Sequence, residues 1–314
     1  MRALVTGGAG FIGSNIVRQL IDEGYSVNVI DNLSSGYLAN IQPLFDTNRV
    51  SFFGGDIRDY SSVERAMKNV DVVFHLAASV GRQRSLDNPQ LDSEINLVGT
   101  INVLEAMRRN GVGKIVYSSS AAMFGELQTP LIDENHPQNA DSPYGVSKLA
   151  AEKMILAYAG LYDFISICLR YFNIYGVNQR YDYYGNVIPI FAKRILSKKP
   201  ITIFGDGKQT RDFVNVKDVA NANILAARNC NETSVYNIGS GESVTILKLA
   251  NMMIDICGEK TNIEFAPERK ADVRHCKANA TKIYNAIGFK TTIGLEQGLA
   301  EYMKWFFDNG LFLD

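Results

Sequence analysis

The sequence predicts an α/β protein with a doubly wound parallel sheet and a smaller C-terminal lobe. Three observations lead to this prediction. Strand-like apolar runs alternate with helical patterns up to about residue 170, a glycine-rich turn follows the first run, and the alternation stops after Arg170. Right-handed β-α-β connections place such strands side by side in one sheet, with helices on both faces. The expected strands lie at residues 4–6, 27–30, 50–53, 72–75, 114–117 and 165–169.

The second part of the chain is expected to form the smaller, substrate-binding lobe. Residues 175–207 are rich in Tyr, Gly, Asn and Asp, which is typical of loops around a ligand, and a helix is expected at 187–197. Two later apolar runs, at 213–216 and 235–238, are candidates to return to the sheet. We therefore expect residues 1–172 to form the first domain, joined by segments near 213–240, and residues 173–314 to form most of the lobe.

The composition excludes several classes of function. Apolar residues make up 46% of the 314 residues and charged residues 21%, and the formal net charge of -1 provides no general basic surface for nucleic acid or anionic lipid. The four cysteines form no C-x-x-C pair and have no metal-ligand spacing with the three histidines, so we expect reduced thiols and no metal. No apolar run approaches the roughly 18 residues that span a bilayer, and the first strand begins near Met1, so we expect a cytoplasmic protein.

The most informative segment is the turn with Gly7, Gly10 and Gly13, because it joins an apolar strand directly to a helical pattern. In such a turn the first glycine permits a positive φ, the second lets the backbone approach a pyrophosphate, and the third allows close packing of the helix on the strand. The N-terminus of the helix then faces the phosphates. The pattern predicts a Rossmann-type dinucleotide site; an ordinary tight strand-to-helix turn is the alternative.

Asp31 supports this interpretation and indicates which dinucleotide binds. It stands eighteen residues after Gly13, at the end of an apolar run, where an acid accepts hydrogen bonds from the adenosine ribose. A 2′-phosphate about 4 Å away would be repelled by about 4 kcal/mol at an effective dielectric constant of roughly 20. We therefore predict NAD rather than NADP, and a capping role for Asp31 is the alternative.

Tyr144 and Lys148 form the candidate catalytic pair. Four residues apart at the start of an expected helix, their side chains lie on one face about one turn apart. Tyrosine has an ordinary pKa of about 10, and the charges of Lys148 and of an oxidised nicotinamide would lower it enough for Tyr144 to act as a base. A strand that ends in three serines supplies Ser120 as a candidate proton relay at the carboxyl edge of the sheet. The alternatives are a solvated helix face and, for the serines, backbone capping by Ser118 or Ser119.

Seven motifs extend this pattern. They are Thr-Gly-Gly-Ala-Gly-Phe-Ile-Gly at 6–13, Asp-Asn-Leu-Ser-Ser-Gly at 31–36, Gly-Asp-Ile at 55–57, His-Leu-Ala-Ala at 75–78, Ser-Ser-Ser at 118–120, Tyr-x-x-x-Lys at 144–148 and Arg-Tyr-Phe-Asn-Ile-Tyr-Gly at 170–176. Together they resemble the extended short-chain dehydrogenase/reductase superfamily, and within it the UDP-hexose 4-epimerases. The resemblance extends from Arg2 to an expected helix at 295–307.

The resemblance implies an isomerase that inverts C4 of a UDP-hexose with NAD. Tyr144 would be the base at the sugar 4-hydroxyl, Ser120 its hydrogen-bonding relay, and Lys148 would hold the nicotinamide ribose while lowering the pKa of the tyrosine. NAD would take a hydride from C4, the 4-keto sugar would turn over in the pocket, and the hydride would return to the opposite face. Ser120 is followed by Ala-Ala-Met at 121–123, where related dehydratases and decarboxylases carry an acid that acts at C5, so the reaction is expected to stop at C4.

The resemblance also assigns residues to the two ligands, with Asp56 and Ile57 expected around adenine. Those implied for NAD are Gly7, Gly10, Phe11, Ile12, Gly13, Asp31, Asn32, Ser35, Gly36, Asp56, Ile57, Leu76, Ala77, Ala78, Tyr144, Lys148 and Tyr171. Those implied for the UDP-sugar are Ser120, Asn173, Asn186, Val187, Thr202, Phe204, Arg211, Val244, Arg269, Asp272 and Cys276. Phe204 is expected to stack on uracil and Arg211 to bind the diphosphate; a surface turn with a solvated charge is the alternative.

Two positions bear on which sugar is accepted. Cys276 lies where the resembling epimerases place either a tyrosine or a small residue, so it predicts acceptance of UDP-N-acetylglucosamine and UDP-N-acetylgalactosamine besides UDP-glucose and UDP-galactose. Packing as a small apolar residue is the alternative. Arg180 matches an arginine that related UDP-glucuronate 4-epimerases place against the sugar carboxylate, although a solvated loop residue is equally consistent. Those enzymes tend to carry threonine where this chain has Asn173, so uronate epimerisation ranks second.

Two further expectations concern the class of protein and its assembly. A non-catalytic NAD-sensing regulator on the same fold is the competing class. Such proteins usually lose the Tyr or the Lys, whereas Tyr144, Lys148 and Ser120 are all present here. By family resemblance, the helices near 95–110 and 145–158 are expected to form the four-helix interface of a homodimer.

Overall fold

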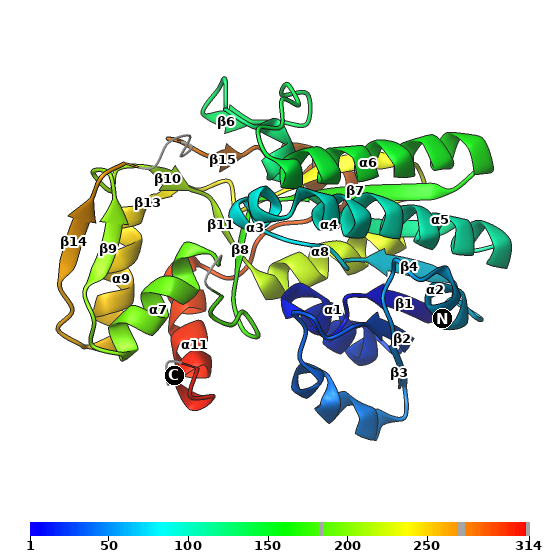
Figure 1. Ribbon diagram of the computed structural model, residues 1–314, viewed down its shortest axis with the longest axis horizontal. Coiled ribbons are helices and arrows are strands. Elements are labelled where there is room, and N and C mark those ends of the chain that lie inside the picture. The colour runs from blue at the N-terminus through cyan, green and yellow to red at the C-terminus, as the bar shows by residue number, and fades with distance from the viewer. Residues whose placement is uncertain (183–184, 269–273, 312–314) are drawn as a thin grey trace.

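A seven-stranded parallel sheet lies at the centre of the computed structural model, which describes residues 1–182, 185–268 and 274–311 (Figure 1). The strand order is β12-β7-β5-β4-β1-β2-β3. The strands are β1 Arg2–Thr6, β2 Ser26–Asp31, β3 Val50–Gly54, β4 Val72–His75, β5 Lys114–Ser120, β7 Ile165–Tyr171 and β12 Ser234–Ile238. The predicted fold class is confirmed, because every strand expected before residue 170 is part of this sheet.

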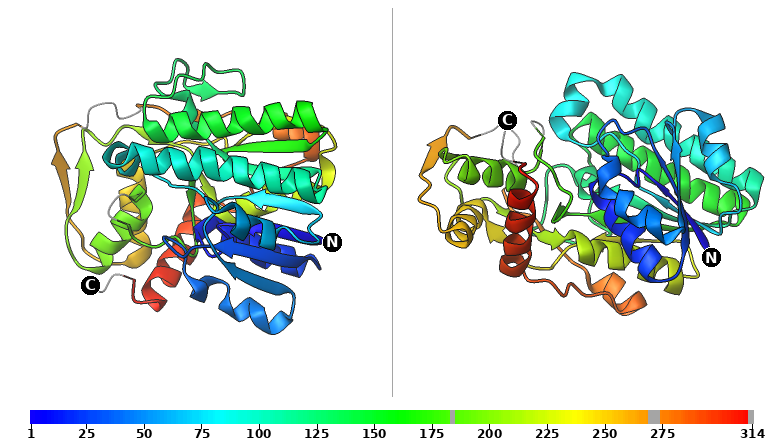
Figure 2. Two further views of the ribbon diagram at one scale, coloured as in Figure 1. Left: turned by 45° about the vertical axis from the view of Figure 1, so that its right-hand side comes forward. Right: turned by 90° about the horizontal axis from the view of Figure 1, so that it is seen from below.

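Helices cover both faces of the sheet (Figure 2). α1 (Phe11–Asp22) and α8 (Val216–Asn229) lie on one face, and α2 (Tyr60–Ala66), α5 (Gly99–Asn110) and α6 (Pro143–Tyr162) on the other. Successive strand residues point to opposite faces, so neighbouring residues of β1 belong to different halves of the core. A sheet buried on both faces needs continuously apolar strands, which is what the sequence pattern detected.

The C-terminal lobe has a core of its own, at the end of the molecule opposite the N-terminus in Figure 1. Its helices α7 (Val187–Leu196), α9 (Ile246–Cys257) and α11 (Leu295–Asp308) pack beside the strand pair β9 (Ile201–Phe204) and β14 (Ile263–Ala266). The two helices expected at 187–197 and 295–307 therefore end within one residue of the observed bounds.

The remaining elements of the described residues are shorter. The helices are α3 (Arg82–Asp87), α4 (Pro89–Ser93), a π-helical turn (Glu94–Val98), α10 (Thr281–Ile287), and 3₁₀ turns at Leu38–Asn40, Gln42–Thr47 and Ala121–Phe124. The strands are β6 (Leu131–Ile132) paired with β15 (Lys277–Ala278), β8 (Asn173–Tyr175) with β11 (Phe213–Asn215), and β10 (Thr210–Arg211) with β13 (Val244–Thr245). None of the helices in the described ranges combines the length and the apolar character that crossing a membrane requires.

One expected return to the sheet is wrong. The run at 213–216 contributes β11, which pairs with β8 outside the central sheet, whereas the run at 235–238 forms β12 at the sheet edge. β7 has β5 on one side and β12 on the other, so no position beside β7 remains for β11. The chain between β11 and β12 forms α8, which packs against α1.

Candidate active site

A cavity of about 1060 Å³ opens at the carboxyl edge of the central sheet. The strand order runs outward in one direction from β1 to β3 and in the other from β4 onward, and ligands of open α/β folds bind at such a switch point. The segments after β1, β2, β4 and β5 line the cavity, and Asn186, Pro189 and Arg211 complete it from the lobe. Ligand pockets measure roughly 300–1,000 Å³, so this volume lies at the upper end of that range.

The turn after β1 has the backbone shape that a pyrophosphate requires. Gly7 has a φ of +68°, and a Cβ there would lie 2.8 Å from the backbone nitrogen of Ala77. A Cβ on Gly13 would lie 2.2 Å from the carbonyl oxygen of Gly7. Gly10 caps α1 without a side-chain hydrogen bond, so no side chain competes for the first N–H groups of the helix. These features fit a dinucleotide such as NAD. All residues that the sequence assigned to NAD line the cavity except Gly36, which packs against Asp31.

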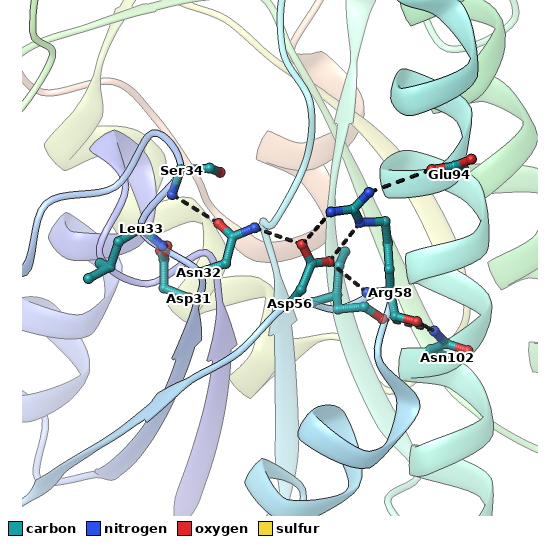
Figure 3. A network of polar contacts seen from close by, with 9 residues as sticks. Asp31, Asn32, Leu33, Ser34, Asp56, Arg58, Glu94 and Asn102 are labelled. Carbon is teal, nitrogen blue, oxygen red and sulfur yellow. Dashed lines mark hydrogen bonds and ion pairs between the residues drawn. The ribbon is translucent and has the colours of Figure 1, made fainter.

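Asp31 lies at the expected adenosine end, in a polar network that Figure 3 shows. Its carboxylate accepts hydrogen bonds from the backbone nitrogens of Ala9 (3.0 Å) and Leu33 (2.8 Å). Burial raises the pKa of Asp31, and these two hydrogen bonds oppose that rise. A carboxylate accepts about four hydrogen bonds, so the capping of two backbone groups leaves acceptor sites for a ribose hydroxyl. The capping alternative and the ribose role are therefore compatible.

Asp56 is held by an arginine that the sequence analysis missed. Arg58 donates from Nε (3.0 Å) and Nη2 (2.8 Å) to the two carboxylate oxygens, and Asn32 donates from Nδ2 at 2.8 Å (Figure 3). The hydrogen bond from Arg58 is the main cause that lowers the pKa of Asp56 to about 2, so the carboxylate stays ionised. Arg58 also contacts Glu94 at 3.5 Å and lines the cavity. The only sequence signal for it was its place directly after the Gly-Asp-Ile motif.

Ser120, Tyr144 and Lys148 all line the cavity, so the structure brings the three candidate catalytic residues together. Ser142 caps α6 by accepting a hydrogen bond from the backbone of Gly145 at 3.2 Å, which places Tyr144 and Lys148 in its first two turns. A side-chain hydrogen bond joins Tyr144 and Ser120. The ammonium nitrogen of Lys148 lies 4.3 Å from the centre of the Tyr117 ring, a distance at which a cation is attracted to the ring face.

The electrostatics of this pair differ from the expectation that Lys148 lowers the pKa of Tyr144. Burial raises the pKa of Tyr144, and the hydrogen bond from Ser120 only partly opposes this rise. Burial also lowers the pKa of Lys148 to about 7. The pattern of residues could not reveal this, because the cost of removing both groups from water depends on the folded surroundings. A phenolate at Tyr144 thus requires further positive charge in the cavity.

All three serines of the run have partners, but Ser120 is the one that is hydrogen-bonded to Tyr144, and it also caps the 3₁₀ turn by accepting from the backbone nitrogen of Ala122 at 3.2 Å. Ser118 donates to the backbone oxygen of His75 at 3.0 Å, and Ser119 donates to Glu152 at 2.6 Å. Glu152 is fully buried and forms a two-point ion pair with Arg170, at 3.1 and 2.7 Å. This ion pair and the Ser119 hydrogen bond fix the end of β5, and therefore Ser120, against α6.

A buried hydrogen-bond chain joins β1 to the helix layer behind the cavity. The Thr100 hydroxyl donates to the backbone oxygen of Asn96 (2.6 Å), so it accepts from Nε2 of His75 (2.9 Å). Nδ1 of His75 then accepts from the Thr6 hydroxyl at 2.7 Å. Burial lowers the pKa of His75 to about 3, so the ring stays neutral. Thr6 also accepts from the backbone of Leu76 at 3.0 Å, which fixes the segment on the expected nicotinamide side.

Only some of the residues that were predicted to bind the UDP-sugar line the cavity. Its lining includes Asn173, Asn186, Arg211 and Cys276. The predicted residues that are not part of the lining are Val187, Thr202, Phe204 and Val244. Arg269 and Asp272 lie outside the described residues. Lining residues that the sequence analysis did not name include Arg82, Arg84 and Asn178.

Asp212 explains how Arg211 and Cys276 come together. It is fully buried and accepts hydrogen bonds from the backbone nitrogens of Ser240 (2.7 Å), Gly241 (3.0 Å) and Ala278 (3.0 Å). One carboxylate therefore ties the end of β10 to β15, which directly follows Cys276.

Comparisons with known proteins agree with this geometry. Residues 4–302 match the family model described as GDP-mannose 4,6 dehydratase. A putative UDP-glucose 4-epimerase from Methanocaldococcus jannaschii is 40% identical over 308 residues, which cover 98% of each chain. The UDP-N-acetylglucosamine 4-epimerase of Methanobrevibacter ruminantium, solved with UDP-N-acetylmuramic acid, has a TM-score of 0.93 at 34% identity and 98% coverage of both chains. The UDP-glucose 4-epimerase of Thermus thermophilus, solved with NAD, has a TM-score of 0.89 at 36% identity and covers 98% of this chain and 99% of its own.

Proposed function

Because this chain belongs to the extended short-chain dehydrogenase/reductase superfamily, in the family described as GDP-mannose 4,6 dehydratase, we propose that it is an NAD-dependent 4-epimerase of UDP-hexoses. One observation carries the proposal: Ser120, Tyr144 and Lys148 line the same cavity as the glycine turn after β1. A regulator that only senses NAD has no need of this trio. The relatives with UDP-sugar 4-epimerase names support the isomerase class.

The residues of the chain have distinct roles in this reaction. NAD, when bound, accepts a hydride from C4 of the sugar and returns it to the opposite face. Tyr144 takes the proton of the 4-hydroxyl at its phenol oxygen and gives it back in the second half of the reaction. Ser120 orients that oxygen through its hydrogen bond. Lys148 would hold the nicotinamide ribose, and the positive charge of the oxidised nicotinamide would favour the phenolate. No carboxylate stands at 121–123, so we expect no elimination at C5.

Cys276 supports the acceptance of N-acetylated sugars. It lines the cavity, and burial raises the pKa of its thiol to about 12, so the side chain stays neutral and small. A tyrosine in its place would add a large ring to the cavity wall. The relative from Methanobrevibacter ruminantium, which is named as a UDP-N-acetylglucosamine 4-epimerase, is consistent with this specificity.

The function and the role of Cys276 are tested in one experiment. The wild-type protein and Cys276→Tyr are incubated with UDP-glucose, UDP-N-acetylglucosamine or UDP-glucuronate, without added NAD, and the products are separated by chromatography. We expect the wild type to epimerise the first two sugars. Cys276→Tyr should lose on the order of 100-fold in kcat/KM on the N-acetylated sugar and keep most activity on UDP-glucose, because only the acetamido group needs the filled space.

Cys276→Ala is the matched control, since it keeps the space open. An equal loss of Cys276→Tyr on both sugars would contradict the role of Cys276 without affecting the proposed reaction. A stable 4-keto-6-deoxy product from the wild type would contradict the 4-epimerase itself.

The position of Arg180 bears on the alternative function, which is epimerisation of UDP-glucuronate. Its guanidinium carbon lies 4.1 Å from the centre of the Tyr37 ring, in the segment that follows Asp31. This stacking holds the guanidinium against the segment that follows Asp31, and Asn173 also departs from the uronate pattern. Both observations favour hexoses over UDP-glucuronate.

The expected homodimer and the cytoplasmic location stay predictions. Large apolar side chains on the α5–α6 side support the dimer, because Val98, Val146 and Leu161 are 48%, 53% and 71% exposed. Burial of these residues in a four-helix interface would remove them from water.

A further inference from the structure

Asp92 is a buried carboxylate that the reaction described above does not use. It lies on α4, which packs against α6 (Figure 1), and it is 1% exposed. Its Oδ2 accepts hydrogen bonds from the Ser147 hydroxyl at 2.6 Å and from the Asn96 amide at 3.2 Å. Its Oδ1 is buried without a hydrogen-bond partner. A carboxylate held only by neutral donors in this position needs a counter-charge nearby.

Lys148 is the buried cation that stands next to the Asp92 contact in the sequence of α6. Ser147 stands directly before Lys148 and three residues after Tyr144, so Asp92 lies behind the turn of α6 that carries both. The other buried carboxylate near Lys148, Glu152, is already neutralised by the two-point ion pair with Arg170. Over the described ranges, no arginine or lysine lies within ion-pair distance of Asp92.

We propose that Asp92 is a positioning residue that supplies the counter-charge for Lys148 and anchors the first turns of α6 through Ser147. The part of this inference that concerns catalysis rests on the proposed 4-epimerase function, whereas the pairing of the Asp92 and Lys148 charges does not depend on that function. The pairing predicts that removal of the Asp92 charge lowers the pKa of Lys148.

The electrostatic environment of Lys148 supports this assignment. Burial lowers the pKa of Lys148, and the Asp92 carboxylate is the strongest of the influences that raise it again. Asp92 also raises the pKa of Tyr144. The groups that face Lys148 are Asp92 on α4, Glu152 on α6, His75 on β4, Tyr117 on β5 and Cys168 on β7.

The first test is the pH profile of kcat. Asp92→Asn keeps both hydrogen bonds through its amide oxygen and removes only the charge. Loss of a negative charge lowers the pKa of both Lys148 and Tyr144, so we expect the profile to move to lower pH by about one unit. Ser147→Ala removes the hydrogen bond and keeps the charge, so its rate falls while its profile stays in place. Asp163→Asn, at the exposed far end of α6, is the charge-matched control and should not shift the profile.

The second test needs no activity. A double-mutant cycle of Asp92→Asn and Lys148→Met measures their coupling in the unfolding equilibrium constant. Since the pKa of Lys148 is about 7, the ammonium predominates at pH 6 and the neutral amine at pH 9. We expect a coupling factor of about ten at pH 6 and less than about two at pH 9.

The outcomes separate the two proposals. Coupling at pH 6 together with no turnover of any UDP-sugar would reject the 4-epimerase and leave the charge pair standing. No coupling at either pH, or equal profile shifts in Asp92→Asn and Ser147→Ala, would overturn the role of Asp92. A coupling that is the same at both pH values would also overturn it, because the pairing would then not depend on the Lys148 charge.

Discussion

Replacement of Tyr144 with phenylalanine is expected to lower kcat for UDP-glucose epimerisation by about 10³-fold, within the range typical of a lost general base. The ring stays in place, so packing is retained, and only the oxygen that carries the sugar proton is removed. The expected loss corresponds to about 4 kcal/mol of transition-state stabilisation. Initial rates at saturating UDP-glucose measure it directly.

The control for Tyr144→Phe is dinucleotide binding. The glycine turn and Asp31 are distant from the phenol in sequence and belong to other elements, so we expect NAD to remain bound and the thermal midpoint to change little. A variant that keeps more than a tenth of the wild-type kcat would show that another group carries the proton. A variant that loses NAD would assign to Tyr144 a binding role instead.

Replacement of Arg170 with methionine is expected to destabilise the protein by about 3–5 kcal/mol. Glu152 is fully buried, and without the guanidinium its charge would keep only the hydroxyl of Ser119. The backbone oxygen of Glu134, which accepts from Arg170 at 2.9 Å, would lose a donor as well. Denaturant unfolding measures the loss of free energy.

Two variants test this explanation. Arg170→Met combined with Glu152→Gln removes both charges and should recover most of the lost stability, because no unpaired charge remains in the core. Arg108→Met breaks an exposed pair with Glu105 and should change the stability far less than Arg170→Met does. If the double variant were as unstable as Arg170→Met alone, the loss would come from packing rather than from the stranded carboxylate.

Local patterns in the sequence predicted most of the central sheet and the cofactor half of the cavity. The glycines at 7, 10 and 13 are informative because the backbone conformation and the close contacts that they permit are local properties. Asp31 follows at a fixed distance along the same β-α-β unit. The pairing of β11 was mispredicted because an apolar run shows that a strand forms but not which edge it joins. In the structure β12 takes the place beside β7, and β11 pairs with β8 instead.

Interactions between distant residues could not be predicted in this way. Asp92 contacts Ser147 across 55 positions and Thr6 contacts His75 across 69, and no spacing rule connects them. The raised pKa of Tyr144 has the same origin, because desolvation is a property of the packed surroundings rather than of the motif. The motifs predicted the candidate reacting groups, and the fold determines their charge states.

The π-helical turn at Glu94–Val98 limits how the length of this chain can vary during evolution. Just before α5, Asn96 reaches across to Ser147 on one neighbour while Thr100 reaches His75 on another. The wide turn already holds one residue more than an α-helical turn, so a further insertion there would not be absorbed by the helix and would displace Asn96 or Thr100 from its partner. Insertions are therefore far easier to accommodate in surface loops than in this single helical turn.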